Sequence, residues 1–290
     1  MDIKAWLEAT RPKTLPASIV PVLVGSSLAF NEGNFRLDLL IVTLICSIFI
    51  QLITNFINEV YDFIKGADNH TRIGPKRQVA SGTISSQTML TVSFIISIIT
   101  FVLGLYLVFN SDIIILIVGI ISIVFAFLYT GGPYPLAYKG LGDIFVFIFF
   151  GLIAVNGSYY VQTLEISKVS ILLSLPPGLL SANILNVNNI RDIDTDHLAG
   201  KITLAYRIGK KNAILLYYIS TIISYIVPFI IYYLTDNIYT LLPLLSLPLA
   251  INLLINIKNK SGKELNSVLA KTGALLFLYG VLNAAAFILK

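Results

Sequence analysis

Long apolar runs are the feature that most limits how this chain can fold. A helix needs about 20 apolar residues to cross the hydrocarbon core of a membrane. Nine segments approach or reach that length, at about 14–30, 37–57, 89–109, 113–130, 143–163, 169–187, 213–234, 238–257 and 268–289. Charged residues make up 12% of the chain, whereas soluble domains carry about 25%. The sequence therefore predicts an all-α integral membrane protein with nine transmembrane helices, in one polytopic domain over residues 1–290.

The distribution of basic residues tests this topology. With nine spans, the N-terminus and every second loop share one side, and 17 of the 20 Lys and Arg residues fall there. The three exceptions are Arg36, Lys168 and Lys290. Because basic residues concentrate in cytoplasmic loops, we expect a multi-pass cell-membrane protein whose N-terminus and two long loops are cytoplasmic. The net charge of +5 then reflects topology, so no nucleic-acid partner is expected, and the oligomeric state is left open.

Two acidic stretches stand out, each where an apolar segment runs into a long loop. The first is "TNFINEVYDFIKGAD", residues 54–68, and the second is "NNIRDIDTDHLAGK", residues 188–201. In each, an asparagine and an aspartate are four residues apart, which places them on one face of a helix. These residues are Asn58 and Asp62 in the first stretch, and Asn188, Asp192 and Asp196 in the second. Either stretch alone could be a solvated loop, but two on the same membrane side favour a functional site.

The chemistry of the two stretches suits a magnesium-bound diphosphate. Their side chains offer oxygen ligands only, and Mg²⁺ is usually held by one or two carboxylates together with water and substrate phosphates. Neither stretch forms a closed cage by itself, so we predict two half-sites that face each other across a cavity. Basic residues that could contact phosphate oxygens accompany both stretches: Lys65, Arg72, Lys76 and Arg77 follow the first, and Arg191 and Lys201 belong to the second.

The two stretches resemble the aspartate-rich motifs of the UbiA superfamily of intramembrane aromatic prenyltransferases. Further similarity, to the MenA branch of that family, lies in "RPKTLPASIVPVLVG", "GPKRQVASGTIS", "YTGGPYPLAYKGLGDIFVFIFFG" and "NNIRDIDTDHLAGKITLAYRIG". These matches cover about the first 210 residues, and Glu59 stands where many members have aspartate. The resemblance implies a UbiA-type bundle around a central cavity, with two pseudo-repeated four-helix bundles and a ninth helix.

The resemblance also implies an activity. It is the transfer of a polyprenyl group from an allylic polyprenyl diphosphate to 1,4-dihydroxy-2-naphthoate with loss of CO₂, giving demethylmenaquinol, inside the lipid bilayer. Asp62, Asp192 and Arg191 would be catalytic. The implied ligands of the Mg²⁺ cofactor are Asn58, Asp62, Asp68, Asn188, Asp192 and Asp196. The implied substrate-binding residues are Lys65, Arg72, Arg77, Tyr129, Tyr134, Lys139, Arg191 and Lys201.

Other hypotheses remain open at this point. The acceptor could be 4-hydroxybenzoate, homogentisate, haem or a lipid-phosphate headgroup. A secondary transporter of an anionic substrate would also combine many spans with internal repeats and broken helices. Its charged residues, however, are expected near the membrane midplane, and here they cluster at one face, which favours the enzyme. The stretch "TGGPYP", residues 130–135, is either a kink that admits substrate or a tight loop.

Overall fold

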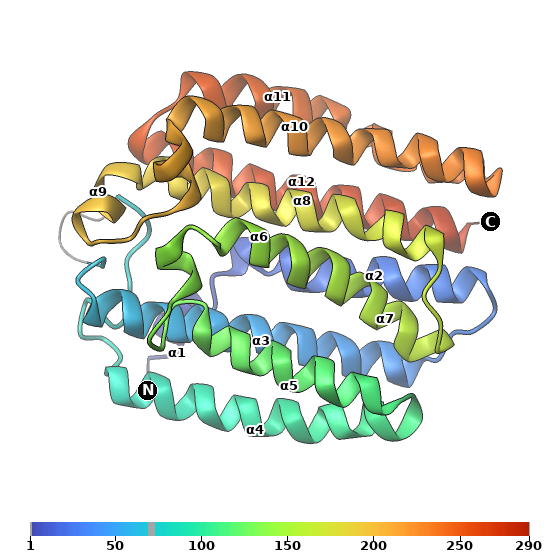
Figure 1. The fold of residues 1–290 in the computed structure, drawn as a ribbon, viewed down its shortest axis with the longest axis horizontal. Helices are drawn as coiled ribbons and strands as arrows, with labels where there is room; N and C mark the ends of the chain where they lie inside the picture. Colours follow the sequence, from blue (N-terminus) through green and yellow to red (C-terminus); the bar gives the residue numbers. More distant parts are fainter. Residues whose placement is uncertain (1, 69–72, 290) are drawn as a thin grey trace.

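The computed structural model describes residues 2–68 and 73–289, and all regular secondary structure in that part of the chain is helical. The long helices lie side by side, roughly parallel or antiparallel to one another (Figure 1). In chain order the helices are α1 Ile3–Ala9, η1 Pro12–Thr14, α2 Pro16–Asn31, α3 Leu37–Ile64, α4 Ser86–Asn110, α5 Ile113–Leu128, η2 Leu136–Lys139, α6 Gly142–Phe147, η3 Ile148–Ile153, α7 Ala154–Thr163, α8 Lys168–Arg191, α9 Ile193–Leu198, α10 Leu204–Thr235, η4 Ile238–Ser246, α11 Leu247–Asn259, η5 Gly262–Glu264 and α12 Leu265–Ile288.

All nine predicted apolar segments are helical, but they differ in their ability to span a membrane. Seven helical stretches in the described part of the chain are long and apolar enough to cross, and an eighth is reached if α1 and α2 count as one bent span. The bend is 54° and lies between residues 3–14 and 16–31. Arg11, with a left-handed φ of 53°, joins α1 to η1 within the first of these segments. Helix α5 is apolar but only 16 residues long. The multi-pass architecture is thus confirmed, whereas a count of nine crossings is not established by helix length.

The packing of the helices leaves one side of many of them for lipid. One large apolar core joins α2, α7, α8 and α10 to α12. Three smaller clusters join α3 to α1, α4, α5 and α7. Outside these cores, large apolar side chains such as Phe94, Ile98, Ile117 and Ile222 are exposed. Exposed apolar bands of this kind are expected where the solvent is hydrocarbon rather than water.

Both acidic stretches lie at the same end of the bundle. Helices α3 and α8 end there, at the left of Figure 1, close to α1 and α9. The C-terminus of the described chain lies at the opposite end. Residues 130–135, the "TGGPYP" stretch, form the turn between α5 and η2. Of the two alternatives for this stretch, the structure therefore shows the tight loop.

Glycine allows two of the spans to approach closely. The span of residues 142–163 contains a π-helical turn, η3, and its Gly151 packs against Gly178 of α8. A Cβ atom added at Gly178 would lie 2.9 Å from the Cα atom of Gly151 and 2.9 Å from the carbonyl oxygen of Phe147. These neighbours are backbone atoms, so a side chain at Gly178 cannot be accommodated by a rotamer change.

We therefore predict that Gly178→Val destabilises the bundle, by about 1–3 kcal/mol as is usual for overpacking of a core. The melting temperature of the detergent-solubilised protein should fall, as followed by loss of the monodisperse peak in size-exclusion chromatography. Gly119→Val is the matched control, because a Cβ at Gly119 meets no atom within 4 Å. Equal melting temperatures for the two variants would contradict the close packing of Gly178.

Candidate active site

A cavity of about 320 Å³ lies inside the bundle. One end is polar, lined by residues of both acidic stretches, which include Asn58, Asp62, Asn188 and Asp192. The rest runs between apolar walls built from α3 to α8, lined by residues such as Leu107, Ile115, Phe149, Ile153 and Val161. The arrangement offers a charged mouth for a polar headgroup and an apolar interior for a hydrocarbon chain.

The first half-site is the C-terminal turn of α3. Asn58, Glu59 and Asp62 are buried there, each less than 10% exposed. The Oδ1 atom of Asn58 accepts a hydrogen bond from the guanidinium of Arg11. The Oδ1 atom of Asp62 accepts one from the Tyr138 hydroxyl at 2.7 Å. The helical spacing predicted from the sequence therefore does place Asn58 and Asp62 together at the cavity wall.

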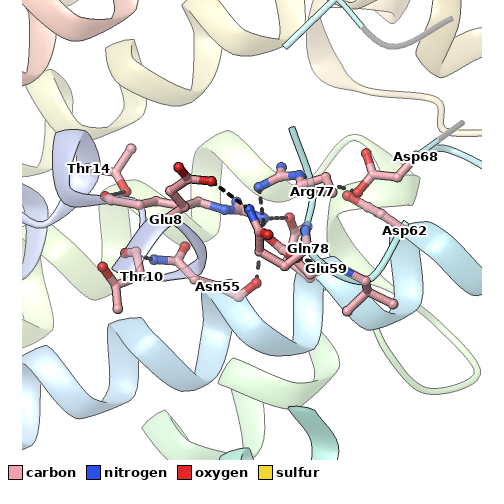
Figure 2. Close-up of polar contacts among 12 residues, drawn as sticks. Glu8, Thr10, Thr14, Asn55, Glu59, Asp62, Asp68, Arg77 and Gln78 are labelled. Atoms are coloured by element: carbon pink, nitrogen blue, oxygen red, sulfur yellow. Dashed lines mark hydrogen bonds and ion pairs between the residues drawn. The ribbon is translucent and has the colours of Figure 1, made fainter. Parts of the chain in front are cut away.

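The side chain of Glu59 contacts the loop that follows α3 and does not line the cavity (Figure 2). Its Oε2 atom accepts hydrogen bonds from the backbone N–H groups of Gln78 and Val79, at 2.9 and 3.3 Å. Arg77 lies between the carboxylates of Glu59 and Asp68, with its Nη1 atom 3.7 Å from Glu59 Oε1 and its Nε atom 3.3 Å from Asp68 Oδ2. Arg77 lines the cavity, whereas neither Glu59 nor Asp68 does. The two acidic residues thus position a guanidinium at the mouth.

The second half-site is the break between α8 and α9. Helix α8 ends at Arg191, and Asp192 has non-helical dihedral angles before α9 begins. The Arg191 guanidinium donates two hydrogen bonds to the Asp192 carboxylate, Nε to Oδ1 at 2.8 Å and Nη2 to Oδ2 at 2.5 Å. It also donates to Asn188 at 2.7 Å and to Asn266 at 2.6 Å. Arg191 does not line the cavity, so its contacts orient Asn188 and Asp192 instead of reaching into the pocket.

Asp196 and Asp194 differ in burial, as expected if Asn188, Asp192 and Asp196 share one helical face. Asp196 is buried, whereas Asp194 is exposed. The chain keeps a helix-like connection across the break, because the Asp196 amide donates to the carbonyl oxygen of Asp192 at 2.8 Å. Asp194 therefore points away from the half-site even though the helix is interrupted.

Lys201 joins the two half-sites. Its ammonium lies 3.6 Å from Asp62 Oδ2 and 3.6 Å from Asp196 Oδ1. Burial lowers the pKa of Lys201, but the nearby carboxylates of Asp62 and Asp196 outweigh burial, so the net shift is upward. The side chain is therefore a permanent cation at the cavity mouth. Lys201 and Lys65 also lie over the ring of Tyr138, at 5.5 and 4.4 Å from its centroid.

The remaining predicted substrate-binding residues are divided by the structure. Tyr129 lines the cavity. Lys65 does not line the cavity and donates to the Thr130 carbonyl oxygen at 2.8 Å. Tyr134 and Lys139 are exposed and contact each other outside the cavity. Arg72 lies outside the described residues.

Several cavity residues were not singled out from the sequence. Arg11 reaches the mouth from the bend between α1 and α2, and the family-like stretch that begins at Arg11 was the available signal. Asp143 and Asn189 form a second polar contact on the wall, 3.4 Å apart. The doubled asparagine "NN" at 188–189 was visible in the sequence, but only the packing of α6 against α8 brings Asp143 to Asn189.

The donor set fits a magnesium ion held partly by substrate. Within the described residues, no group of three or more carboxylate, histidine or cysteine side chains is arranged to hold a metal by itself. Oxygen ligands nevertheless converge on the mouth from two helices, and Mg²⁺ commonly completes its shell with phosphate and water. Among the described residues of the two half-sites and their adjoining segments, five carboxylates are matched by five basic side chains: Glu59, Asp62, Asp68, Asp192 and Asp196 against Arg11, Lys65, Arg77, Arg191 and Lys201. A diphosphate added to this balanced set would bring excess negative charge, which divalent cations would offset.

Comparison with known proteins is consistent with this geometry. The model of the UbiA prenyltransferase family matches residues 18–283. A 1,4-dihydroxy-2-naphthoate octaprenyltransferase from Haemophilus influenzae is 40% identical over 217 residues, which cover 71% of this chain and 70% of the relative. One of the same name from Mycobacterium leprae is 32% identical over 285 residues, covering 98% and 96% of the two chains.

A solved structure shares the fold. It is that of a UbiA homologue from Archaeoglobus fulgidus bound to DMAPP and Mg²⁺, with a TM-score of 0.71 and 16% identity over 98% of this chain and 99% of that one. The family model spans most of the chain and the curated relatives exceed 30% identity. The chain therefore belongs to the UbiA prenyltransferase family.

Proposed function

We propose that this protein transfers a polyprenyl group from an allylic polyprenyl diphosphate to 1,4-dihydroxy-2-naphthoate, with loss of CO₂, giving demethylmenaquinol for menaquinone synthesis. The observation that carries the proposal is one cavity with two aspartate half-sites at its mouth and an apolar interior. The naphthoate acceptor follows from the curated relatives of that name. The diphosphate would sit at the mouth, and the prenyl tail would follow the apolar walls.

We assign Mg²⁺ binding to the residues that were expected from the sequence to hold it. Asp62 and Asp192 would hold Mg²⁺ from opposite sides of the diphosphate, with Asn58 and Asn188 as neutral oxygen ligands and Asp68 and Asp196 beside them. Support comes from the related structure described as bound to DMAPP and Mg²⁺. When bound, Mg²⁺ supplies positive charge next to the leaving diphosphate as the allylic C–O bond breaks.

The basic residues divide into two groups in this proposal. Arg11, Arg77 and Lys201 line the cavity and would donate to phosphate oxygens, exchanging their present carboxylate and amide partners for the substrate. Arg191 acts as a positioning residue, because its donors are already engaged by Asp192, Asn188 and Asn266. Lys65 supports Tyr138, while Tyr134 and Lys139 would contact substrate only outside the mouth. Arg72 keeps its proposed role as a substrate-binding residue.

The cavity walls protect the allylic cation that forms. Water would capture such a cation, so the reaction needs an enclosed apolar space. Tyr129, Phe125, Phe145 and Phe149 line the wall beyond the mouth. Aromatic faces attract cations by about 0.5–2 kcal/mol each, so these rings would stabilise the cation until the acceptor carbon attacks it.

Membrane orientation completes the proposal. We propose nine crossings in one domain over residues 1–290, with α2 and α5 as short spans that the bilayer accommodates by local thinning. The end that carries both acidic stretches would face the cytoplasm, together with the N-terminus, because basic residues gather there. Substrate headgroups would then enter from the cytoplasmic side.

A product assay tests the reaction. Detergent-solubilised protein given a polyprenyl diphosphate, 1,4-dihydroxy-2-naphthoate and Mg²⁺ should form prenylated naphthoquinol and release diphosphate and CO₂. EDTA should stop the reaction, and 4-hydroxybenzoate should give little product. Robust product from 4-hydroxybenzoate but none from the naphthoate would contradict the acceptor and leave prenyl transfer standing.

Substitutions in the two half-sites test the metal ligands. Asp62→Asn and Asp192→Asn should each lower turnover by about 100-fold or more, since each removes charge next to the leaving group. Asp194→Asn should stay within about twofold of the parent, because Asp194 is exposed and points away from the half-site. All three variants should elute as monodisperse protein. A loss at Asp194 as large as at Asp192 would count against the assignment.

Cysteine labelling tests the orientation. In a Cys46→Ala background, Gln87→Cys and Asp236→Cys place thiols at exposed positions at opposite ends of the bundle. A membrane-impermeant maleimide added to intact cells should label the thiol at position 236 and not the one at position 87. Both should react after the cells are permeabilised. Preferential labelling at position 87 in intact cells would reverse the orientation.

A further inference from the structure

Asp143 is a buried carboxylate in the cavity that neither half-site uses. It lies in the first turn of α6 and is 7% exposed, and it forms part of the cavity wall. Its side-chain hydrogen bond in the described structure comes from the amide of Asn189, at 3.4 Å to Oδ2. No ion pair of Asp143 occurs among the described residues. It differs in this respect from Asp62, Asp68, Asp192 and Asp196, each of which has a basic partner.

The surroundings of Asp143 offer neutral donors instead of cations. Asn189 follows Asn188 of the second half-site directly, so the Asp143 contact lies beside that half-site. The Tyr129 hydroxyl lies against the same turn, because a Cβ atom added at the neighbouring Gly142 would be 3.0 Å from it. Asn189 and Tyr129 also line the cavity. Together the three residues form a polar patch on the wall, here called the Asp143 patch, that carries a single negative charge.

A carboxylate in this position carries a cost that a purely structural residue would avoid. A buried charge without a cationic partner is unfavourable unless hydrogen-bond donors satisfy it. Placement in the first turn of α6 offers partial compensation, but α6 has only six residues. A further hydrogen-bond donor, presented by a substrate in the cavity, would lower that cost.

The two substrates differ in whether they can supply that donor. A diphosphate carries only negative charge and would be repelled by Asp143, while a prenyl tail offers no hydrogen bond. The aromatic acceptor has two hydroxyl groups, each of which can donate to a carboxylate. Hydrogen-bond complementarity therefore orients the acceptor with a hydroxyl on the Asp143 patch.

We propose that Asp143 is a catalytic residue that accepts a hydrogen bond from a ring hydroxyl of the aromatic acceptor and takes its proton during prenyl transfer. The inference rests on the proposed function. As the ring carbon that bears the carboxylate bonds to the allylic carbon, the diphosphate leaves with the C–O electron pair. The hydroxyl on the ring carbon next to that carbon gives its proton to Asp143 and becomes a carbonyl, because only that hydroxyl is conjugated with the attacking carbon. When CO₂ leaves, the electron pair of its bond returns to the ring, and the oxygen takes the proton back from Asp143.

The test variant is Asp143→Asn, which keeps the shape of the side chain and a contact with Asn189 but cannot take up a proton. Transfer to 1,4-dihydroxy-2-naphthoate should fall by about 100-fold or more, within the range that general-base catalysis contributes. Binding of the polyprenyl diphosphate and the Mg²⁺ concentration for half-maximal activity should stay within about twofold. Asp143→Glu, which restores a carboxylate, should recover part of the activity. Asp38→Asn is the matched control, since Asp38 also lies in the first turn of a helix, at the other end of the bundle.

Acceptor analogues separate a catalytic role from a structural one. The parent protein should keep activity on 1-hydroxy-2-naphthoate, which retains the hydroxyl next to the carboxylate-bearing carbon. It should lose most activity on 4-hydroxy-2-naphthoate, which lacks that hydroxyl. Asp143→Asn should show no such difference between that analogue and the full acceptor, because the partner of the hydroxyl is already gone. Parent-like transfer by Asp143→Asn would overturn the inference. So would a loss that comes with a raised Mg²⁺ requirement, weaker diphosphate binding or an unchanged analogue preference.

The outcome for the parent protein is read separately. If the parent prenylates the naphthoate, the proposed function stands whatever Asp143→Asn does. If it prenylates only another hydroxylated aromatic, the acceptor assignment fails and the Asp143 comparison is made on that compound. If Asp143→Asn elutes as aggregate, Asn189→Ala takes its place in the comparison. This variant keeps the Asp143 carboxylate and removes its present hydrogen-bond partner. Asn189→Ala should retain the analogue preference of the parent, and loss of that preference would overturn the inference.

Discussion

The ammonium of Lys201 between Asp62 and Asp196 is the interaction on which the mouth of the cavity depends. These carboxylates come from the end of α3 and from α9, more than 130 residues apart in the chain. Without a cation between them, the buried carboxylates of the two half-sites would repel each other. The same position is the one that the proposed diphosphate and Mg²⁺ would share. Lys201 therefore joins the two half-sites and, in the proposed function, supplies a donor that substrate can recruit.

Supporting contacts surround the residues that line the cavity. Arg191 fixes Asp192 and Asn188 through three hydrogen bonds, and Glu59 fixes the loop that carries Arg77. Such outer contacts fix the orientation of metal-binding side chains, and their loss typically weakens metal affinity or activity. They also explain why a glutamate at position 59 is compatible with the site, since its longer side chain reaches the backbone amides of Gln78 and Val79.

Some sequence expectations were altered by geometry that spacing alone does not contain. A helical segment, residues 3–14, precedes the first predicted span at an angle of 54°, and Arg11 of that segment lines the cavity. Tyr134 and Lys139 were expected to bind substrate, yet both are exposed in the segment that follows α5. Arg191 was expected to bind substrate, but its neighbours Asp192 and Asn188 occupy donors of its guanidinium.

The sequence by itself determined the all-helical membrane architecture, the common side of the two acidic stretches and the pairing of Asn58 with Asp62. These properties follow from apolar run length, charge distribution and the 3.6-residue helical period, all of which are local. Only the tertiary structure decided which basic residues reach the cavity, how Lys201 joins the half-sites and that Asp143 meets Asn189. Those contacts join helices distant in sequence, so they depend on how the helices pack, which no local pattern specifies.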